Sequence, residues 1–325
     1  DFHTVIHELG HALGLKHSFE DGGELSAQYD NYRYTVMSYD NVADWNWKQI
    51  TQTATGIRWD GTEVAPSTPM LLDVIAIQAK YGANLTVSAG DTTYSWSEAR
   101  PIMETVYDSG GIDTFDLSGN TRGSVVDLNP GTFSSIARWT GAEQAKYWAG
   151  VYGQGYASFL NSTFGASDTY TWSNNVAIAT NTIIENVIGS AGADTVTGNS
   201  AANTIHGGLG DDSISGGAGL DYLRGEEGND TIVGGADFDD IHGNMGDDKL
   251  WGGDGHDWVV GGKDNDLLYG EAGDDIVYGN MGEDTCEGGA GADIVRGGQG
   301  NDIVRGGDGN DWLAGDRGDD TITGG

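Results

Sequence analysis

Apolar positions in the C-terminal part of the chain recur at every ninth residue. From Gly189 to Thr323 the sequence divides into 15 nine-residue units without an insertion or a deletion. The first position of every unit is glycine and the eighth is apolar, from Val196 to Ile322. Glycines at positions one, two and four permit a tight loop with positive φ values, and the last three residues can form a short strand with position eight facing inward. Two units would form one turn of a flattened parallel β-roll whose strands stack about 4.8 Å apart.

Aspartate occupies the sixth position of these units, with Asn203 as the one exception. Stacked loops would bring carboxylates and carbonyls together, and oxygen-only ligands on a turn-rich backbone select calcium. The period is that of the calcium-binding RTX repeat, and one ion per stacked pair of loops gives an upper figure of about 13 ions. The candidate calcium ligands of the repeats are Asp194, Asp212, Asp221, Asp230, Asp239, Asp248, Asp257, Asp266, Asp275, Asp284, Asp293, Asp302, Asp311 and Asp320. Because residues 189–325 carry 29 acidic and 6 basic residues, we expect this region to be disordered without calcium and to fold when calcium binds.

A second pattern, near the N-terminus, places histidines on one face of a predicted helix. His7 and His11 are four residues apart, so both rings leave the same face and can occupy two corners of a tetrahedral zinc site. Glu8 adjoins the first of them, where its carboxylate can act as a general base toward water. Gly14 can end the helix in a left-handed conformation, after which the chain can present His17 as a third ligand. A fourth position left open is typical of a catalytic zinc site.

A methionine follows this motif in the segment Tyr34–Tyr39. Met37 stands in a V-M-S-Y context 20 residues after His17. Three spaced histidines followed by a methionine turn are the metzincin signature, and Met37 would form the apolar floor beneath the imidazoles. On these residues the chain resembles the serralysin family of secreted bacterial zinc proteases. The resemblance implies that Tyr39 ligates zinc or moves away to stabilise the transition state.

The segment 69–84 resembles the helix that closes the serralysin protease domain. Its apolar residues lie on nearly every side of the predicted helix, as a buried helix requires. Between it and the repeats, residues 107–119 resemble the first calcium loop of the serralysin C-terminal domain. That resemblance implies that Asp113 and Asp116 are calcium ligands, with solvated turn residues as the alternative. Residues 138–170 depart from the family and are rich in aromatic side chains. Packing against the neighbouring β-structure is favoured over contact with a polymer or a surface.

These patterns predict an α+β region followed by an all-β parallel β-roll. We expect residues 1–84 to be the C-terminal part of a metzincin catalytic domain, residues 85–188 a β-rich joining region, and residues 189–325 the RTX roll. The chain begins six residues before His7 and ends inside a repeat. Since a metzincin has a sheet-bearing half before its zinc helix, we expect a fragment of a longer protein, with weak or absent proteolysis by the fragment alone.

Composition narrows the possible functions. The chain of 325 residues has 50 acidic and 15 basic residues, a net charge of −35, which excludes nucleic acid as a binding partner. It contains no run of 18 apolar residues, so no transmembrane segment is predicted. Cys286, the single cysteine, falls at an eighth position, where a small buried hydrophobe is expected.

The leading hypothesis is a secreted, extracellular zinc endopeptidase that acts on proteins and peptides. It would use one catalytic Zn²⁺ and several structural Ca²⁺ ions. The family resemblance implies type I secretion machinery as a partner, and we expect a monomer. The alternative is a calcium-binding RTX surface or adhesin-like protein with a non-functional protease remnant. The presence of all three histidines together with Glu8 favours the enzyme.

Overall fold

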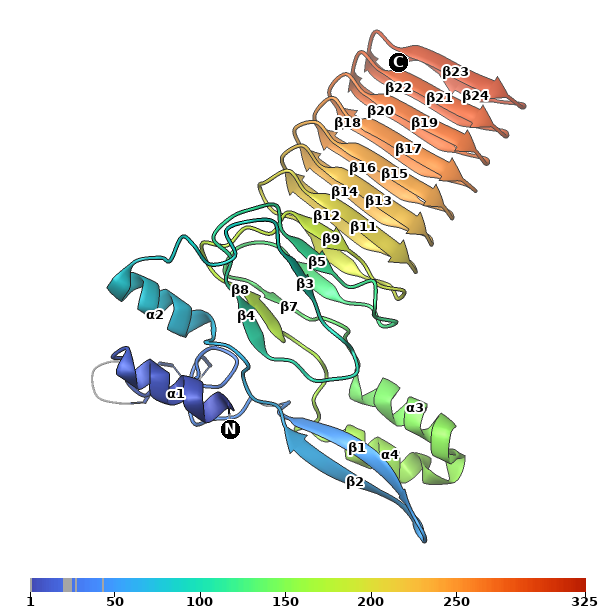
Figure 1. Cartoon of the computed structure of the whole chain (residues 1–325). Helices are drawn as coiled ribbons and strands as arrows, with labels where there is room; N and C mark the ends of the chain where they lie inside the picture. The colour runs from blue at the N-terminus through green and yellow to red at the C-terminus, as the bar shows by residue number, and fades with distance from the viewer. Residues whose placement is uncertain (1, 20–24, 27, 43) are drawn as a thin grey trace. The chain divides into compact units, whose positions relative to one another are not determined.

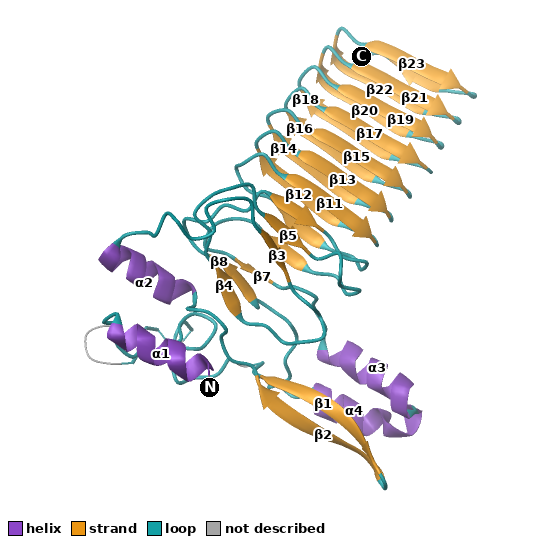
Figure 2. Cartoon of the chain, in the orientation of Figure 1, coloured by secondary structure: helices purple, strands orange, loops and turns teal. Residues whose placement is uncertain are grey.

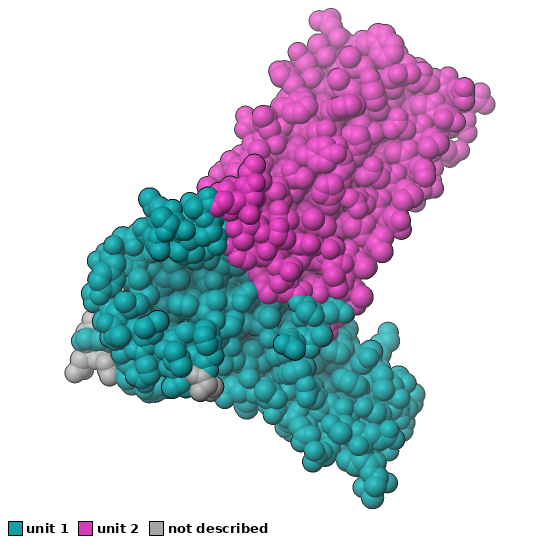
Figure 3. All heavy atoms as spheres, viewed as in Figure 1, with its two compact units in different colours: residues 1–89, 97–109, 130–182 teal, residues 90–96, 110–129, 183–325 magenta. Residues whose placement is uncertain are grey.

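The structure is a computed structural model that describes residues 2–19, 25–26, 28–42 and 44–325 (Figure 1). The chain forms two compact units (Figure 3). Unit 1 comprises residues 1–89, 97–109 and 130–182, and unit 2 comprises residues 90–96, 110–129 and 183–325. Each unit is therefore assembled from separate stretches of sequence, and residues 85–188 contribute to both.

Unit 2 is a parallel β-roll built from two sheets (Figure 2). One sheet has the order β24-β22-β20-β18-β16-β14-β12-β10-β6 and the other β23-β21-β19-β17-β15-β13-β11-β9-β5-β3. Val196 pairs with Ile214 in the first sheet and Ile205 with Leu223 in the second, a register of 18 residues. The prediction that two nonapeptides form one turn of a roll is confirmed.

The strands within the repeats are β10 (Thr195–Thr197), β11 (Thr204–Leu209), β12 (Ser213–Ala218), β13 (Tyr222–Glu227), β14 (Thr231–Ala236), β15 (Asp240–Met245), β16 (Lys249–Asp254), β17 (Trp258–Lys263), β18 (Leu267–Ala272), β19 (Ile276–Met281), β20 (Thr285–Gly291), β21 (Ile294–Gln299), β22 (Ile303–Gly309), β23 (Trp312–Arg317) and β24 (Thr321–Thr323). Most of them are six residues long, twice the predicted length, because pairing continues through the first three positions of the following unit.

The eighth position of the repeat supplies the interior of the roll. From Val196 to Val304 these side chains are at most 2 % exposed, and Cys286 lies among them with no exposed surface. Near the end of the chain the burial weakens, and Ile322 is 50 % exposed. One inward apolar residue per unit is therefore enough for a continuous core, since each lies directly beneath its equivalent on the next turn.

The glycine at the first position has a different role from the one predicted. Gly208 and Gly210, at the second and fourth positions, have the expected positive φ of 108°. Gly207, at the first position, does not have a positive φ. A Cβ on Gly207 would lie 2.3 Å from Oδ2 of Asp212. The first position therefore needs glycine for the close approach of its own loop carboxylate, not for backbone conformation.

The roll begins before the first nonapeptide. Strands β3 (Thr93–Ser95), β5 (Thr114–Asp116) and β9 (Asn186–Ile188) extend one sheet, and β6 (Val125–Asp127) extends the other. These early strands pair in the same parallel manner as the repeats but lack the periodic glycines, which is why the sequence pattern did not place them in the roll.

Unit 1 holds the N-terminal helix α1 (Phe2–Ala12), helix α2 (Leu71–Tyr81) and a small sheet. The sheet consists of β4 (Glu104–Val106), β8 (Val176–Ile178) and β7 (Phe133–Ser134), in that order. Helix α2 forms where a closing helix was expected. It is less buried than its apolar sequence suggested, because only Leu71 and Asp73 among its residues are buried.

The aromatic stretch 138–170 packs inside unit 1. It forms α3 (Gly141–Tyr152), the short 3₁₀ helix η1 (Gln154–Tyr156) and α4 (Ala157–Phe164), beside a hairpin of β1 (Asn46–Thr53) and β2 (Gly56–Glu63). Their shared core contains Ile50, Ala149, Leu160 and Phe164. The structure thus supports the packing interpretation of this stretch.

None of the described helices is long and apolar enough to cross a membrane.

Candidate functional site

The three motif histidines converge on one point. His7 and His11 project from α1, and His17 comes from the loop that follows it. The Nε2 atom of His17 lies 3.3 Å from Nε2 of His7 and 3.0 Å from Nε2 of His11. Nitrogen ligands of a tetrahedral zinc site, each about 2.0–2.1 Å from the metal, are about 3.3–3.4 Å apart. The spacing of these imidazoles therefore fits a shared zinc ion.

The other ring nitrogens fix the orientation of two imidazoles. Nδ1 of His7 lies 2.7 Å from the carbonyl oxygen of Val36, and Nδ1 of His11 lies 3.1 Å from that of Leu15. A carbonyl can only accept, so each Nδ1 carries the proton and each Nε2 is left with a lone pair. Lone pairs aimed at one point repel unless a cation or a proton lies between them. This donor set fits a metal ion.

Tyr39 joins the imidazole cluster, and Glu8 adjoins His7 along the helix. The hydroxyl of Tyr39 lies 2.8 Å from Nε2 of His17, and its ring stacks on His7 with a centroid separation of 5.3 Å. The side chain of Tyr39 is nevertheless 59 % exposed, so it has room to move. Glu8 is exposed on α1, next to His7. The arrangement offers three imidazole ligands and a phenol around one point.

Met37 lies buried beneath the histidines, and its fit depends on a residue that the sequence pattern did not single out. Met37 is 2 % exposed. A Cβ on Gly10 would lie only 2.5 Å from its sulfur atom. Gly10 therefore lets Met37 approach α1 between the two ligand positions. The signal in the sequence was a glycine in the interior of a helix, which costs stability unless packing requires it.

A second residue missed by sequence reasoning is Asp73, in the first turn of α2. Its Oδ2 accepts hydrogen bonds from the N–H groups of Val36 and Met70, at 2.8 and 2.9 Å, and its other oxygen accepts one from the Thr35 hydroxyl. The carbonyl of the same Val36 holds His7. Burial raises the pKa of Asp73 and its hydrogen bonds oppose that shift. Asp73 thus fastens the methionine turn to α2.

Gly14 lies where α1 ends. It has φ of 84°, and the N–H of Leu15 returns to the carbonyl of Gly10 at 3.0 Å. The carbonyl of Leu13 accepts hydrogen bonds from Lys80 Nζ and from the Tyr81 hydroxyl, at 3.0 and 2.9 Å. The turn that carries the chain toward His17 is therefore held by the last turn of α2.

The second candidate site is the row of aspartates at the sixth position of the repeats, which we call the carboxylate ladder. Oδ1 of Asp212 accepts the N–H of Asp194 at 2.7 Å, and Oδ1 of Asp230 accepts the N–H of Asp212 at 2.8 Å. The same contact recurs every 18 residues in both sheets, as far as Asp311 and Asp320. Each aspartate therefore ties its loop to the loop one turn earlier.

The second carboxylate oxygen, Oδ2, has no hydrogen-bond partner in most of these aspartates. Among the described residues, Oδ2 is buried and has no hydrogen-bond partner in Asp212, Asp221, Asp230, Asp239, Asp248, Asp257, Asp266, Asp275, Asp284, Asp293 and Asp302. A buried carboxylate oxygen without a donor is costly, and a hard cation removes that cost. The ladder therefore fits calcium, with one open oxygen per loop.

Several aspartates of the ladder have a pKa above the ordinary value of an aspartate. Burial raises the pKa of Asp212 and Asp266 to about 8 and that of Asp248 to about 7. The hydrogen bond from the preceding aspartate's N–H opposes the shift, whereas the charges of neighbouring aspartates add to it. Without a cation, these carboxylates would hold protons close to neutral pH.

The first predicted ligand of the repeats differs from the others. Oδ2 of Asp194 accepts hydrogen bonds from both the N–H and the hydroxyl of Ser190, at 2.7 and 2.9 Å. Its Oδ1 accepts the N–H of Ser124. Ser190 stands where most units have their second glycine, and it supplies the donors that the later loops lack.

The two predicted ligands before the repeats lie in different settings. Asp113 is fully buried, its Oδ1 accepts the N–H of Thr92 at 2.8 Å, and its own N–H donates to Glu185 at 2.8 Å. Asp113 and Glu185 therefore extend the ladder toward the N-terminus, although Glu185 was not among the predicted ligands. Oδ1 of Asp116 accepts the N–H and hydroxyl of Ser118, at 3.0 and 2.6 Å, in a local turn. That geometry is the one expected of a turn residue.

Two known families match different parts of this chain. Residues 74–145 match the family described as Peptidase M10 serralysin C terminal. Residues 188–325 match the RTX calcium-binding nonapeptide repeat in four copies, over 188–223, 224–259, 251–286 and 287–325. The RTX match agrees with the 18-residue turns and with the calcium character of the repeats.

Similar proteins include Serralysin C of Dickeya chrysanthemi, which is 34 % identical over 211 residues, and Serralysin of Photorhabdus luminescens, which is 36 % identical over 215 residues. Metallopeptidase AprA of Pseudomonas marginalis is 35 % identical over 213 residues. Each alignment covers 59 % of this chain, and the chain spans about a third of the length of these relatives (35–36 %). The chain is thus similar to the serralysins, and it combines a match to the serralysin C-terminal region of peptidase M10 with RTX calcium-binding repeats.

Proposed function

We propose that this chain carries the metal-binding core of a secreted zinc endopeptidase whose C-terminal roll is stabilised by calcium. The observation that carries the proposal is the convergence of three imidazoles, with Nε2 of His17 3.3 Å from that of His7 and 3.0 Å from that of His11. Backbone carbonyls orient the rings of His7 and His11. His7, His11 and His17 would hold zinc. When bound, zinc supplies a Lewis acid that polarises the scissile carbonyl.

Glu8 and Tyr39 would supply the proton chemistry and charge stabilisation. Glu8 is exposed beside His7, where its carboxylate can take a proton from the attacking water and return it to the leaving amine. The Tyr39 hydroxyl, 2.8 Å from His17 Nε2, can leave that nitrogen and donate a hydrogen bond to the oxyanion of the transition state. The exposure of Tyr39 supports this movement. Met37 and Gly14 would have structural roles, as the floor of the site and the end of its helix.

The open Oδ2 atoms of the ladder would be the calcium ligands, together with carbonyl groups of the stacked loops. Asp194 would bind calcium less well than Asp212, because Ser190 already donates to its Oδ2. Asp116 would be a turn residue. Residues 189–325 would form the calcium-binding domain, and the earlier strands β3, β5, β6 and β9 would form the first turns of the same roll.

The remaining aspects of the function follow from the relationship to the serralysins. The substrates would be extracellular proteins and peptides. Export would use type I secretion machinery, and the protein would act outside the cell as a monomer.

The decisive experiment measures zinc and hydrolysis together. Zinc content is determined by mass spectrometry after dialysis, for the wild type, His11→Ala and Glu8→Ala, and hydrolysis is followed with a quenched fluorescent peptide. We expect one zinc per chain in the wild type and in Glu8→Ala, none in His11→Ala, and hydrolysis only in the wild type. If the wild type of this chain gives no hydrolysis, the same variants are compared in the longer protein that contains it.

His206→Ala is the matched control, since His206 lies on the roll and pairs with Glu226. It should retain both zinc and activity. Wild-type protein that binds calcium but no zinc, in this chain and in the longer protein, would contradict the enzyme and favour a calcium-binding surface protein.

A further inference from the structure

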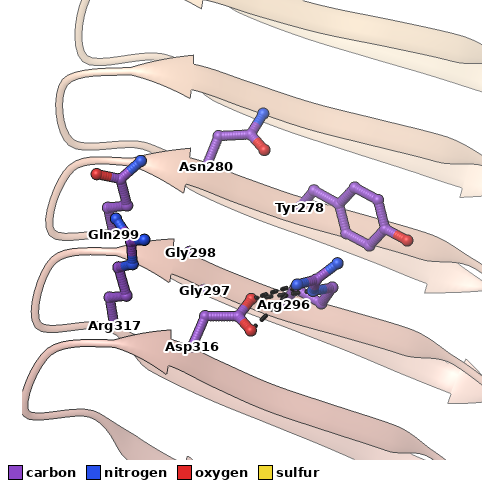
Figure 4. A pocket seen from close by; sticks show the side chains of 8 residues that line it. All are labelled: Tyr278, Asn280, Arg296, Gly297, Gly298, Gln299, Asp316 and Arg317. Atoms are coloured by element: carbon purple, nitrogen blue, oxygen red, sulfur yellow. Dashed lines mark hydrogen bonds and ion pairs between the residues drawn. The ribbon is translucent and has the colours of Figure 1, made fainter.

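We propose that the outer face of the roll binds a neutral saccharide chain at strands β19, β21 and β23. A cavity of about 410 Å³ opens there (Figure 4). It is lined by Tyr278, Asn280, Arg296, Gly297, Gly298, Gln299, Asp316 and Arg317. Its size falls within the range of small-molecule sites, roughly 300–1,000 Å³. The side chains that line the site are not among the histidines and aspartates proposed to hold zinc or calcium, so it stands apart from the peptidase proposal.

The cavity exists because one side chain is missing from a row. Asn280, Gly298 and Asp316 occupy the same position on three successive turns. The neighbours of Gly298 carry side chains and Gly298 does not, so Gly297 and Gly298 form the floor between two walls (Figure 4). Gly298 has φ of 119°, and a Cβ on it would lie 2.2 Å from the carbonyl oxygen of Asn280, so this floor position requires glycine.

The walls of the cavity present fixed polar groups. Nε and Nη2 of Arg296 donate to the two carboxylate oxygens of Asp316, at 2.9 and 3.1 Å. This two-point contact holds the guanidinium in place and leaves its remaining N–H groups for a ligand. The side chains of Gln299 and Arg317 lie together at the opposite end of the cavity, as Figure 4 shows. Gln299, Arg317 and Asn280 are all exposed.

The mixture of charges points to an uncharged ligand. Arg296 and Asp316 largely offset each other's charge, and the excess of acidic residues over basic ones in 189–325, 29 against 6, opposes an anion. The guanidinium of Arg317 opposes a cation. Carboxylate, amide and guanidinium groups together offer both acceptors and donors at close spacing. A sugar hydroxyl both donates and accepts a hydrogen bond, so it needs one acceptor and one donor. Neighbouring hydroxyls on a sugar ring match such a lining better than an ion does.

A row of large apolar side chains runs along the same sheet. Trp258, Ile276, Ile294 and Trp312 are register partners on β17, β19, β21 and β23. Trp258 is 40 %, Ile294 36 % and Trp312 55 % exposed. Three strand spacings separate the two tryptophans, about 14 Å. The Arg296 guanidinium lies 5.9 Å from the Trp312 ring centre, so the row passes close to the cavity.

Exposed indole rings beside polar groups favour a sugar polymer. One face of a pyranose ring carries C–H groups and packs on a flat aromatic ring, while the hydroxyls at its edge need hydrogen bonds. The row and the cavity supply these two kinds of contact on one face. An extended peptide would also contact the row, so its binding is the competing outcome of the test.

The test removes a polar group from one wall of the cavity. Gln299→Ala deletes an exposed amide, and Glu227→Ala is the matched control at the same position of the repeat, four turns away. Trp312→Ala and its control Tyr222→Ala probe the exposed row in the same manner. All variants are studied as the full chain in saturating calcium, with circular dichroism to verify the fold.

Binding is measured by affinity electrophoresis in gels that contain laminarin, galactomannan, polygalacturonate or gelatin. We expect one of the two neutral polysaccharides to retard the wild type, Gln299→Ala and Trp312→Ala each to weaken that binding severalfold, and both controls to retain it. Retardation by neither neutral polysaccharide overturns the proposal. So does retardation by polygalacturonate or gelatin alone, or equal loss in Gln299→Ala and Glu227→Ala.

Discussion

The imidazole cluster of unit 1 and the carboxylate ladder of unit 2 are built in opposite ways. The cluster draws His7 and His11 from one helix, His17 from a loop, Tyr39 from the methionine turn, and its support from Asp73 on another helix. The ladder repeats one contact, between an aspartate Oδ1 and an N–H group 18 residues earlier. A site used once depends on particular distant contacts, whereas a repeated site depends on a period.

This difference determines how each site should fail. Loss of one supporting contact in the cluster affects the whole site, because no second copy exists. Loss of one aspartate of the ladder affects the loops next to it, and the rest of the roll retains its own contacts. The following changes test that contrast.

Calcium removal should have the largest effect, and it should be confined to the ladder. Eleven open, buried carboxylate oxygens would be left without a partner, so dialysis into calcium-free buffer should abolish most of the β-sheet signal in circular dichroism. Zinc content, measured in the same samples with zinc in the buffer, should change little. An unchanged spectrum would contradict the role of calcium in folding the roll.

Acid should partly replace calcium. The folded-state pKa of Asp212 and Asp266 is raised to about 8 and that of Asp248 to about 7, above the ordinary value of an unfolded aspartate. A raised pKa gives stability that is present at low pH and is lost as the pH rises through the folded-state value. The calcium-free roll should therefore be more ordered at pH 5 than at pH 8, as judged by circular dichroism. The opposite trend would show that the carboxylates are not buried together.

Truncation of an interior side chain should cost less, but still a large part of the stability. Leu250 has no exposed surface, so Leu250→Ala should lower the free energy of unfolding by about 2–5 kcal/mol in saturating calcium. Ile322 occupies the same position of the repeat but is 50 % exposed, and Ile322→Ala should cost much less. Denaturant titration of both variants measures the difference. Equal effects would mean that position eight is not the core of the roll.

Asp73→Asn should weaken zinc binding by about 10- to 100-fold, the range typical of residues that orient metal ligands. The substitution places an amide where a carboxylate now accepts the N–H groups of Val36 and Met70, so the Val36 carbonyl would no longer hold His7 as firmly. Zinc affinity is measured by competition with a chromogenic chelator. Asp60→Asn, at an exposed position of β2, is the control and should bind zinc normally.

The smallest effect is expected at Cys286. Its side chain has no exposed surface, and burial raises the pKa of its thiol. Cys286→Val keeps a small apolar group in the row and should change the free energy of unfolding by less than about 1.5 kcal/mol. With calcium the wild-type thiol should react slowly with a maleimide, and without calcium it should react rapidly. Rapid labelling in calcium would place the thiol outside the core.

Periodic features were predictable from the sequence because each unit repeats the same information. The register of the roll and the burial of Val196 to Val304 follow from the spacing of glycine, aspartate and apolar residues. The convergence of the three histidines followed from a known spacing. In both cases the contacts lie between residues whose separation in sequence is characteristic.

Contacts between unrelated segments were not predictable in the same way. Asp73 reaches Val36 across 37 residues, and Lys48 of the hairpin reaches Asp168 across 120 residues. Nothing in the local pattern of either residue indicates its partner. The early strands β3 and β5 were hidden because their backbone pairs like a repeat while their side chains do not follow one.

Because one 18-residue turn contains two units, an even or an odd number of units decides in which sheet a strand lies. Deletion of 18 residues would shorten the roll by one turn and leave every later strand in its own sheet. Deletion of nine residues would move every later strand to the opposite sheet, while each unit kept its glycines and its inward apolar residue. If the nine residues were removed between Tyr278 and Arg296, these two side chains, which now share one face, would be on opposite faces of the roll. Insertions and deletions in this region therefore differ in consequence by whether they are even or odd multiples of the unit, and only the even ones preserve the surface.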